Sequence, residues 1–207
     1  IGRWSALFPD DAAALIAPSV VKLPQTLNEK IAVRTKHLQA YQGAQLSRRY
    51  VRMLERTADP ELKLALAKGY HKLLAYKDEY EVARLHLGTY AKASETFEGP
   101  FEMTFHLAPP LLSKNGSDRR PQKRSFGPWM LGPLRVLSTL RVLRGTALDP
   151  FGYTAERRME RALIAQYEED MAAILPVVTP ATHEIAVALA NLPLDIRGFG
   201  PVKQANE

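Results

Sequence analysis

The side chains that could bind a metal ion are thinly spread along this sequence. Its 207 residues include five histidines and no cysteine, so a metal site would depend on histidine and carboxylate ligands. His183 is followed by Glu184, but position 187 is valine, so the second histidine of a zinc-protease helix is absent. Arg84, not histidine, stands three residues after Glu81, unlike the Glu-x-x-His pair of di-iron bundles. The sequence therefore does not favour a metal site.

Acidic side chains are concentrated at residues 78–81, where paired carboxylates could divide the roles of a catalytic acid and base. Their spacing favours a different interpretation. Lys77 is four residues before Glu81, and Arg84 is three residues after it, which is typical of ion pairs along one helix face. We therefore expect this cluster to be structural, with catalysis and partner contact as the alternatives.

Residues 156–161 also combine acids with arginines, but their spacing does not favour ion pairs within one helix. Like charges recur at i,i+4, so pairing within the helix is poor. The planar guanidinium of arginine suits carboxylates on other elements. We expect Arg157, Arg158 and Arg161 to reach acids on neighbouring elements.

Motifs for nucleotide binding and acyl transfer are missing. Residues 198–200 read Gly-Phe-Gly without a third glycine or a following helix, and no Gly-Lys-Ser/Thr or Gly-x-Ser-x-Gly sequence occurs. The absence of cysteine excludes a disulfide, a thiolate zinc site and an iron–sulfur cluster held by this chain alone. We assign no catalytic, cofactor-binding or metal-binding residue.

The charge of the chain is unevenly distributed. The net charge is +6, and residues 113–148 alone carry +7, with eight basic residues and one acid. A solvated loop is one interpretation, and docking of an acidic protein or a nucleic acid is the other. Only Phe126 and Trp129 supply aromatic rings there, which disfavours nucleic acid. The candidate docking residues are Lys114, Arg119, Arg120, Lys123, Arg124, Arg135, Arg141 and Arg144.

Helical patterns dominate the first half of the chain. A short helix is expected at 11–17, and apolar residues at helical spacing predict one long or once-broken helix over 26–54, with only Gly43 inside it. Asp59 and Pro60 are a start signal for a second helix, whose apolar stripe continues to about Gly88. We expect these two helices to pack as an antiparallel hairpin.

A short hairpin is expected in the middle of the chain. Residues 101–107 alternate apolar and polar side chains, which predicts a strand. The polar stretch 113–124 and the apolar pair that follows it predict a basic hairpin near 101–126. Two prolines open a helix over 128–144, and Gly145 closes it.

Two further helices complete the pattern. Thr154 can cap the first, in which apolar side chains recur every four residues. The second begins at residues 179–180. We expect Met159, Leu163, Tyr167 and Met171 of the first, and Ile185, Leu189 and Leu192 of the second, to face inward. The expected fold class is mostly α, a helical domain with long antiparallel helices and one small β-hairpin.

Several stretches resemble the C-terminal region of the fused, single-chain indolepyruvate ferredoxin oxidoreductases, over residues 41–203. The matching stretches are 75–85 (AYKDEYEVARL), 105–110 (FHLAPP), 126–130 (FGPWM), 143–146 (LRGT), 149–161 (DPFGYTAERRMER) and 196–203 (IRGFGPVK). They occur in the same order as in that family, and none of them is one of its catalytic motifs.

The resemblance implies a parent enzyme that oxidatively decarboxylates an aryl 2-oxoacid. Thiamine diphosphate, magnesium and an iron–sulfur cluster would be its cofactors, ferredoxin its electron acceptor, and coenzyme A the acceptor of the acyl group. Those centres lie upstream of the matched region in the family. Residues 1–25 would then be a connector from the upstream catalytic domain, and residues 26–207 a non-catalytic helical domain.

The expected partners follow from the same resemblance. They are the upstream domains of the same chain, ferredoxin, and a second subunit in a homo-oligomer. A start at Ile1 instead of methionine fits a fragment, and no transmembrane segment or signal peptide is found, so we expect a cytoplasmic protein. The alternative is a binding module that takes up an acidic protein or a nucleic acid through residues 113–144.

Overall fold

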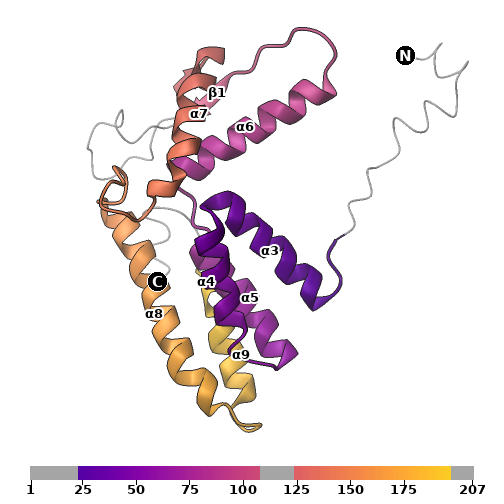
Figure 1. Cartoon of the computed structure of the whole chain (residues 1–207), viewed down its shortest axis with the longest axis vertical. Coiled ribbons are helices and arrows are strands. Elements are labelled where there is room, and N and C mark those ends of the chain that lie inside the picture. The colour runs from indigo at the N-terminus through magenta and orange to yellow at the C-terminus, as the bar shows by residue number, and fades with distance from the viewer. Residues whose placement is uncertain (1–22, 108–123, 197–207) are drawn as a thin grey trace, which may run out of the picture.

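The computed structural model describes residues 23–107 and 124–196, and these are mostly helical (Figure 1). The helices are α3 (Leu27–Tyr41), α4 (Ala44–Leu54), α5 (Pro60–Leu74), α6 (Glu79–Thr96), α7 (Leu131–Thr139), α8 (Ala155–Ile174) and α9 (His183–Asn191). The strands are β1 (Phe105–Leu107) and β2 (Arg124–Phe126). The expected fold class is confirmed. The helix expected at 11–17 and the hairpin tip at 113–123 lie outside the described residues.

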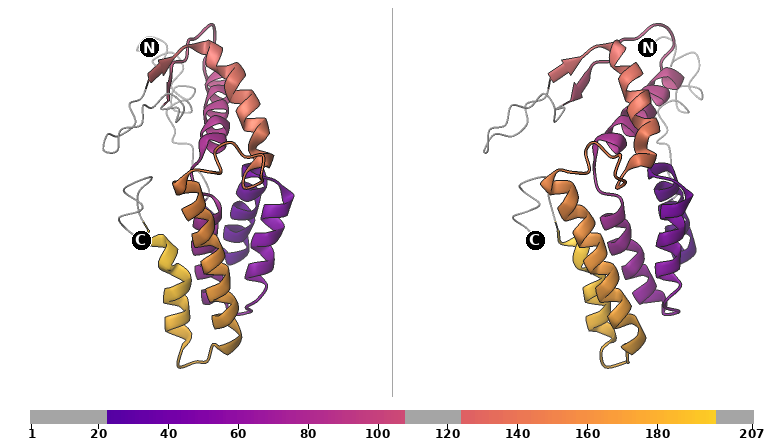
Figure 2. Two further views of the ribbon diagram at one scale, coloured as in Figure 1. Left: turned by 90° about the vertical axis from the view of Figure 1, so that its left-hand side faces the viewer. Right: turned by 60° about the vertical axis from the view of Figure 1, so that its left-hand side comes forward.

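The elements form two units. The first, which we call the bundle, consists of α3, α4, α5, α8 and α9, and its central helix α5 contacts each of the other four. The second, which we call the arm, consists of α6, α7 and the two strands. Figure 2 shows the arm standing at one end of the bundle. No described helix combines the length and the apolar character needed to cross a bilayer.

The first helices begin and end where the sequence signals predict. Thr26 and Glu29 form a reciprocal capping box at the start of α3. Gly43 has φ 134°, a value that side chains with a Cβ avoid, and it separates α3 from α4. The Asp59 carboxylate accepts the N–H of Leu62 at the start of α5. The once-broken helix and the capped second helix are therefore confirmed.

The prediction of one continuous helix from residue 60 to Gly88 is wrong. α5 ends at Leu74, and a new helix, α6, begins after Asp78. The Asp78 carboxylate accepts the N–H of Glu81 at 2.8 Å, so it satisfies a backbone donor that a continuous helix would have used internally. α6 then passes Gly88 and ends at Thr96. The break carries the chain from the bundle into the arm.

Tyrosines form much of the bundle core. The rings of Tyr50 and Tyr70 stack with centroids 6.1 Å apart, and those of Tyr70 and Tyr167 with centroids 5.8 Å apart. Each hydroxyl has a partner: Tyr50 donates to the Ala67 carbonyl, Tyr167 to the Ala190 carbonyl, and Tyr70 to the Glu168 carboxylate. The rings thus bury large apolar areas without stranding a polar atom. The surrounding side chains include Leu38, Leu54, Leu62, Leu66, Leu74 and Met171.

The inward face predicted for the last helix is wrong. Ile185 and Leu192 of this segment are 61% and 57% exposed, and the buried positions of α9 are Ala186 and Ala190. A Cβ on Gly69 of α5 would lie 2.1 Å from the Ala190 carbonyl oxygen. The backbones of α5 and α9 therefore approach too closely for leucine between them. Leu189 is also exposed.

The buried face of α8 agrees with the prediction only in part. Tyr167 and Met171 are buried, as expected. Met159 and Leu163 are half-buried, and the remaining buried positions are Arg157, Glu160 and Ile164. The first half of α8 faces polar groups at the base of the arm, so charged side chains replace the apolar ladder there.

The arm has a small core of its own. It consists of Ala83, Phe105, Met130 and Leu134. The predicted hairpin is confirmed, with Phe105 opposite Phe126 in antiparallel register. The helix predicted over 128–144 is an α-helix between two 3-10 turns, at 128–130 and 140–143. Gly145, with φ 74°, follows it.

Candidate functional site

The structure separates the candidate docking residues. Lys114, Arg119, Arg120 and Lys123 lie outside the described residues. Arg124 on β2 and Arg135 on α7 are exposed. Arg141 is half-buried and donates from Nη1 to the Ser138 carbonyl at 2.8 Å. Of the described candidates, Arg124 and Arg135 are therefore the two that stand fully at the surface.

Arg144 is not a surface docking residue, which corrects its assignment. Its side chain is 3% exposed and makes an ion pair with Asp78 through both carboxylate oxygens. Its Nη1 donates to the Tyr41 carbonyl at 2.7 Å, and the guanidinium lies 3.6 Å from the centre of the Tyr41 ring. A count of charges along the sequence does not show which arginine is buried against an acid, so it could not distinguish Arg144 from the exposed arginines near it.

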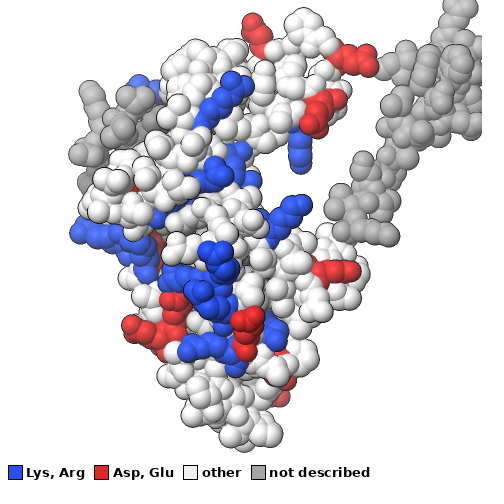
Figure 3. Space-filling model, in the orientation of Figure 1, with Lys and Arg blue, Asp and Glu red and all other residues white. Residues whose placement is uncertain are grey.

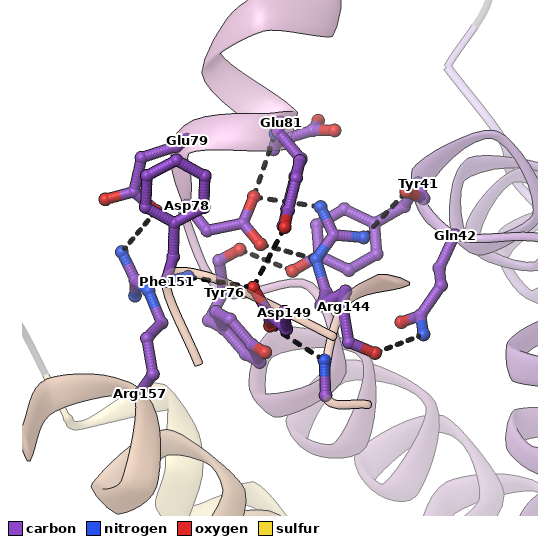
Figure 4. Close-up of polar contacts among 12 residues, drawn as sticks. Tyr41, Gln42, Tyr76, Asp78, Glu79, Glu81, Arg144, Asp149, Phe151 and Arg157 are labelled. Carbon is purple, nitrogen blue, oxygen red and sulfur yellow. Dashed lines mark hydrogen bonds and ion pairs between the residues drawn. The ribbon is translucent and has the colours of Figure 1, made fainter. Parts of the chain in front are cut away.

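The Arg144–Asp78 pair is the centre of a buried polar cluster, which we call the junction (Figure 4). Asp78 connects α5 to α6, Tyr41 ends α3, and Arg144 begins the segment that leads to α8. Gln42 donates to the Arg144 carbonyl at 3.0 Å. Burial acts to lower the pKa of Arg144, but the hydrogen bond with Asp78 and the electrostatic contributions of Tyr41, Asp78 and Tyr76 together outweigh burial and raise that pKa. Arg144 therefore remains charged.

Asp149 organises the other side of the junction. Its carboxylate accepts the Tyr80 hydroxyl at 2.9 Å, the N–H of Gly145 at 2.9 Å and the N–H of Phe151 at 3.1 Å. The Phe151 ring packs edge-on against Tyr80, with centroids 5.3 Å apart. These contacts fix the loop between α7 and α8 against α6. Burial, followed by the Asp149 hydrogen bond, raises the Tyr80 pKa.

Glu79 and Arg157 meet at the edge of the junction. The Glu79 Oε2 lies 3.6 Å from the Arg157 Nη2, which confirms that Arg157 reaches an acid on another element. Burial raises the Glu79 pKa, and the Arg157 charge opposes that shift. Glu79 Oε2 and Arg157 Nη1 are buried without a hydrogen-bond partner among the described residues. Arg161 donates instead to the Gly152 carbonyl.

Two histidines of the bundle contact each other, and one of them also reaches the arm. The His37 Nδ1 is 3.0 Å from the His71 Nε2, and the His37 Nε2 is 3.6 Å from the Glu81 Oε1. Burial, then the His37 charge, lowers the His71 pKa to about 4. Burial would raise the Glu81 pKa, but the hydrogen bonds from Arg84 and His37 lower it to about 2. Both ring nitrogens of His37 therefore face protein groups.

A comparison with protein-family models gives one match. The model described as a family of unknown function (DUF6537) matches residues 27–207, most of the chain. The chain belongs to this family. The DUF6537 match starts at the first residue of α3, so it takes in both the bundle and the arm. Searches of the curated proteins and of the solved structures find no match.

By its geometry, the junction of this DUF6537 chain holds separate segments of the chain together. Asp78, Arg144 and Asp149 each bind groups of other segments, and Glu81 binds Arg84 through two hydrogen bonds of 2.8 and 2.6 Å. This agrees with the structural interpretation of the acidic cluster. Within residues 23–107 and 124–196, no group of three His, Cys, Asp or Glu side chains is placed to hold a metal ion.

The sequence contains signals for two structural features that the sequence predictions above do not include. An aspartate before a first turn with two glutamates is a helix start, and Asp78, Glu79 and Glu81 fit it. The second feature is a pair of exposed arginines on α4, Arg48 and Arg52. Figure 3 shows basic side chains gathered in the middle of one face of the molecule. The i,i+4 spacing of the two arginines was the available signal.

Proposed function

We propose that this chain is a non-catalytic C-terminal domain of an aryl 2-oxoacid ferredoxin oxidoreductase. Its role would be to contact the upstream domains of the same chain, a second subunit or a partner. The single observation that carries the proposal is where the stretches of resemblance lie. Residues 75–85, 143–146 and 149–161 supply Asp78, Arg144 and the Asp149 turn, which bind one another at the junction. Side chains that hold a domain together suit a scaffold.

In this proposal the chemistry belongs to other parts of the parent enzyme. Thiamine diphosphate and magnesium would serve decarboxylation of indolepyruvate or a similar oxoacid there. An iron–sulfur cluster would pass electrons to ferredoxin, and coenzyme A would accept the acyl group. A chain without cysteine has no thiolate to hold such a cluster, which agrees with that division.

The reading frame upstream of Ile1 tests the proposal most directly. We expect it to encode thiamine-binding and cysteine-rich cluster segments in the same chain. A start codon immediately before Ile1 would overturn the proposal. The purified chain should also show no turnover of indolepyruvate with ferredoxin and coenzyme A, and measurable turnover would contradict the assigned role.

A second candidate role is docking of ferredoxin, favoured by the exposure of Arg124 and Arg135. Changing both to serine in the parent enzyme should slow ferredoxin reduction mainly at low ionic strength. Lys92→Ser together with Arg158→Ser, which removes the same charge from α6 and α8, is the matched control. An unchanged salt dependence in the first variant would exclude these two residues from ferredoxin docking.

A further inference from the structure

The loop at residues 145–154, between Arg144 and α8, carries the most exposed large apolar side chain of the described residues. Leu148 is 75% exposed, and Tyr153 of the same loop is 66% exposed. The Tyr153 hydroxyl donates to the Ala147 carbonyl at 2.5 Å, so the end of the Tyr153 side chain reaches the residue before Leu148. The two exposed side chains therefore belong to one continuous surface.

Hydrogen bonds hold this loop in one shape. The buried Asp149 carboxylate accepts the N–H groups of Gly145 and Phe151, which lie on either side of it in the chain (Figure 4). A Cβ on Gly152 would lie 3.0 Å from the same carboxylate, so the loop closes tightly around the Asp149 side chain. A loop that is already ordered loses little conformational entropy when it binds a partner. The Leu148 side chain is therefore pre-organised for a contact.

The exposed surface of the loop is uncharged. Its one charged residue is Asp149, which is 3% exposed and accepts the Tyr80 hydroxyl in the interior. Arg161 of α8 borders the loop, but it is half-buried and donates to the Gly152 carbonyl at 2.7 Å. Apolar surface without charge is typical of the centre of a permanent interface, whereas acidic carriers and nucleic acids are bound through charged groups. The loop therefore fits a permanent partner.

The loop is too small to hold a separate protein by itself. Seven of its ten residues are exposed, whereas a stable interface between separate proteins uses about 20–30 residues on each side. A domain of the same polypeptide is held at a high effective concentration, so a smaller contact is sufficient to dock it. The size of the loop therefore favours a domain of the same chain over a second copy or a separate protein.

We propose that the loop at residues 145–154 inserts Leu148 into an apolar pocket on the adjoining upstream domain of the same polypeptide, with the Tyr153 ring covering the edge of that pocket. The inference deepens the contact role proposed above, and it rests on the proposed function only in requiring an upstream domain in the same chain. Asp149 also binds Tyr80 of α6, so the side chain that organises the junction would fix the position of this contact as well.

Hydroxyl-radical footprinting of Tyr153 tests the contact. The samples are the 207-residue chain and the full polypeptide that contains it, and mass spectrometry measures the oxidation of Tyr153 in each. Tyr153 is 66% exposed in the chain by itself, so we expect rapid oxidation there. In the full polypeptide we expect Tyr153 to be protected, because the upstream domain would cover it.

Variants of the full polypeptide assign the protection to Leu148. Leu148→Ser should raise Tyr153 oxidation about tenfold, because loss of a buried apolar contact shifts the docking equilibrium toward the open form. Leu148→Ile keeps the side-chain volume and should retain protection. Ile185→Ser, at a 61% exposed site on α9, is the matched control and should leave Tyr153 oxidation unchanged. Far-ultraviolet circular dichroism checks that each variant remains folded.

Four results would overturn the proposal. They are equal oxidation of Tyr153 in the two samples, protection that survives Leu148→Ser, protection in the 207-residue chain that increases with its concentration, and protection of that chain by phosphatidylcholine vesicles. The third would indicate a second copy and the fourth a membrane surface. The reading frame upstream of Ile1 tests the proposed function separately. A domain of another class there would overturn the parent enzyme and leave this test intact, whereas a start codon immediately before Ile1 would overturn both.

Discussion

The bundle buries seventeen side chains of the described residues in one core, whereas the core of the arm has four. Buried apolar area is the main favourable contribution to folding, so the two units differ greatly in what they can contribute. Small cores rarely sustain an independent fold. The comparison indicates that the bundle supports the arm, and that the arm depends on the junction.

Buried polar groups lie at the contact between the units. Asp78 and Arg144 form a buried ion pair, and Asp149 receives hydrogen bonds from Tyr80 and Gly145. Removing one partner of a buried pair leaves an uncompensated charge, so such pairs enforce geometry more than they add stability. We therefore expect the junction to hold the arm in place on the bundle, so that its loss opens the arm first.

The largest effect is expected from Asp78→Ala. The change strands the Arg144 guanidinium in the interior and removes the N-cap of α6, for a loss of about 3–5 kcal/mol from the pair alone. Urea unfolding should show the loss, and hydrogen exchange should show α6 opening first. Asp170→Ala, at an exposed site on α8, is the control and should change stability little. A loss confined to a few tenths of a kcal/mol would contradict the role of the junction.

Leucine truncations compare the two cores directly. Leu66 is fully buried in the bundle, and Leu66→Ala should lower global stability by about 2–5 kcal/mol. Leu134 is buried in the arm, and Leu134→Ala should raise hydrogen exchange in α6, α7 and the hairpin while α5 stays protected. Equal loss of protection in both units after Leu134→Ala would mean that they unfold together.

Local signals in the sequence predicted most of the fold. The caps at Asp59 and Thr154 act through their own side chains, so a capping residue followed by an apolar pattern was enough to place these two helix starts. Contacts between segments that are distant in the sequence could not be predicted from these local signals. The α9 face was assigned wrongly because its orientation depends on Gly69 in a helix more than a hundred residues away.

The candidate site was less predictable than the fold. Arg135 and Arg144 are nine residues apart and have the same chemistry, yet one is exposed and the other is buried beside Asp78. That difference arises from contacts across more than sixty residues of sequence, which no local charge pattern contains. The exposure of Trp129 and Val136 was similarly hidden, because apolar spacing alone does not say which side of a helix is covered.

Alanine substitutions at two glycines should change the free energy of unfolding by smaller amounts and in opposite directions. A Cβ on Gly69 would meet the Ala190 carbonyl oxygen, so Gly69→Ala should force α5 and α9 apart and cost about 1–3 kcal/mol. Gly88 on α6 has no atom within 4 Å of its Cβ position, so Gly88→Ala should stabilise the arm by up to about 1 kcal/mol. Urea midpoints measure both. A stabilising Gly69→Ala would contradict the close helix crossing.

Acidification is expected to have an effect with a defined direction in each unit. Burial lowers the pKa of His71 to about 4, and it also lowers the pKa of His86 in the arm. His71 faces His37 and Arg34 of α3 and the Tyr50 ring of α4. The unfolded chain takes up protons near pH 6.5, where the folded chain does not. Both units should therefore lose stability as the pH falls below 6.5.

Urea midpoints at pH 7 and pH 5 measure this effect. His71→Gln should flatten the decrease in the bundle, and His86→Gln should do so only for exchange in the arm. His183 has the opposite sign, since its hydrogen bond with Asp59 raises its pKa, and that stability is lost as the pH rises. His183→Gln should thus leave the acid-side decrease in place. If His71→Gln retained the full decrease, the depressed pKa of His71 would not be its cause.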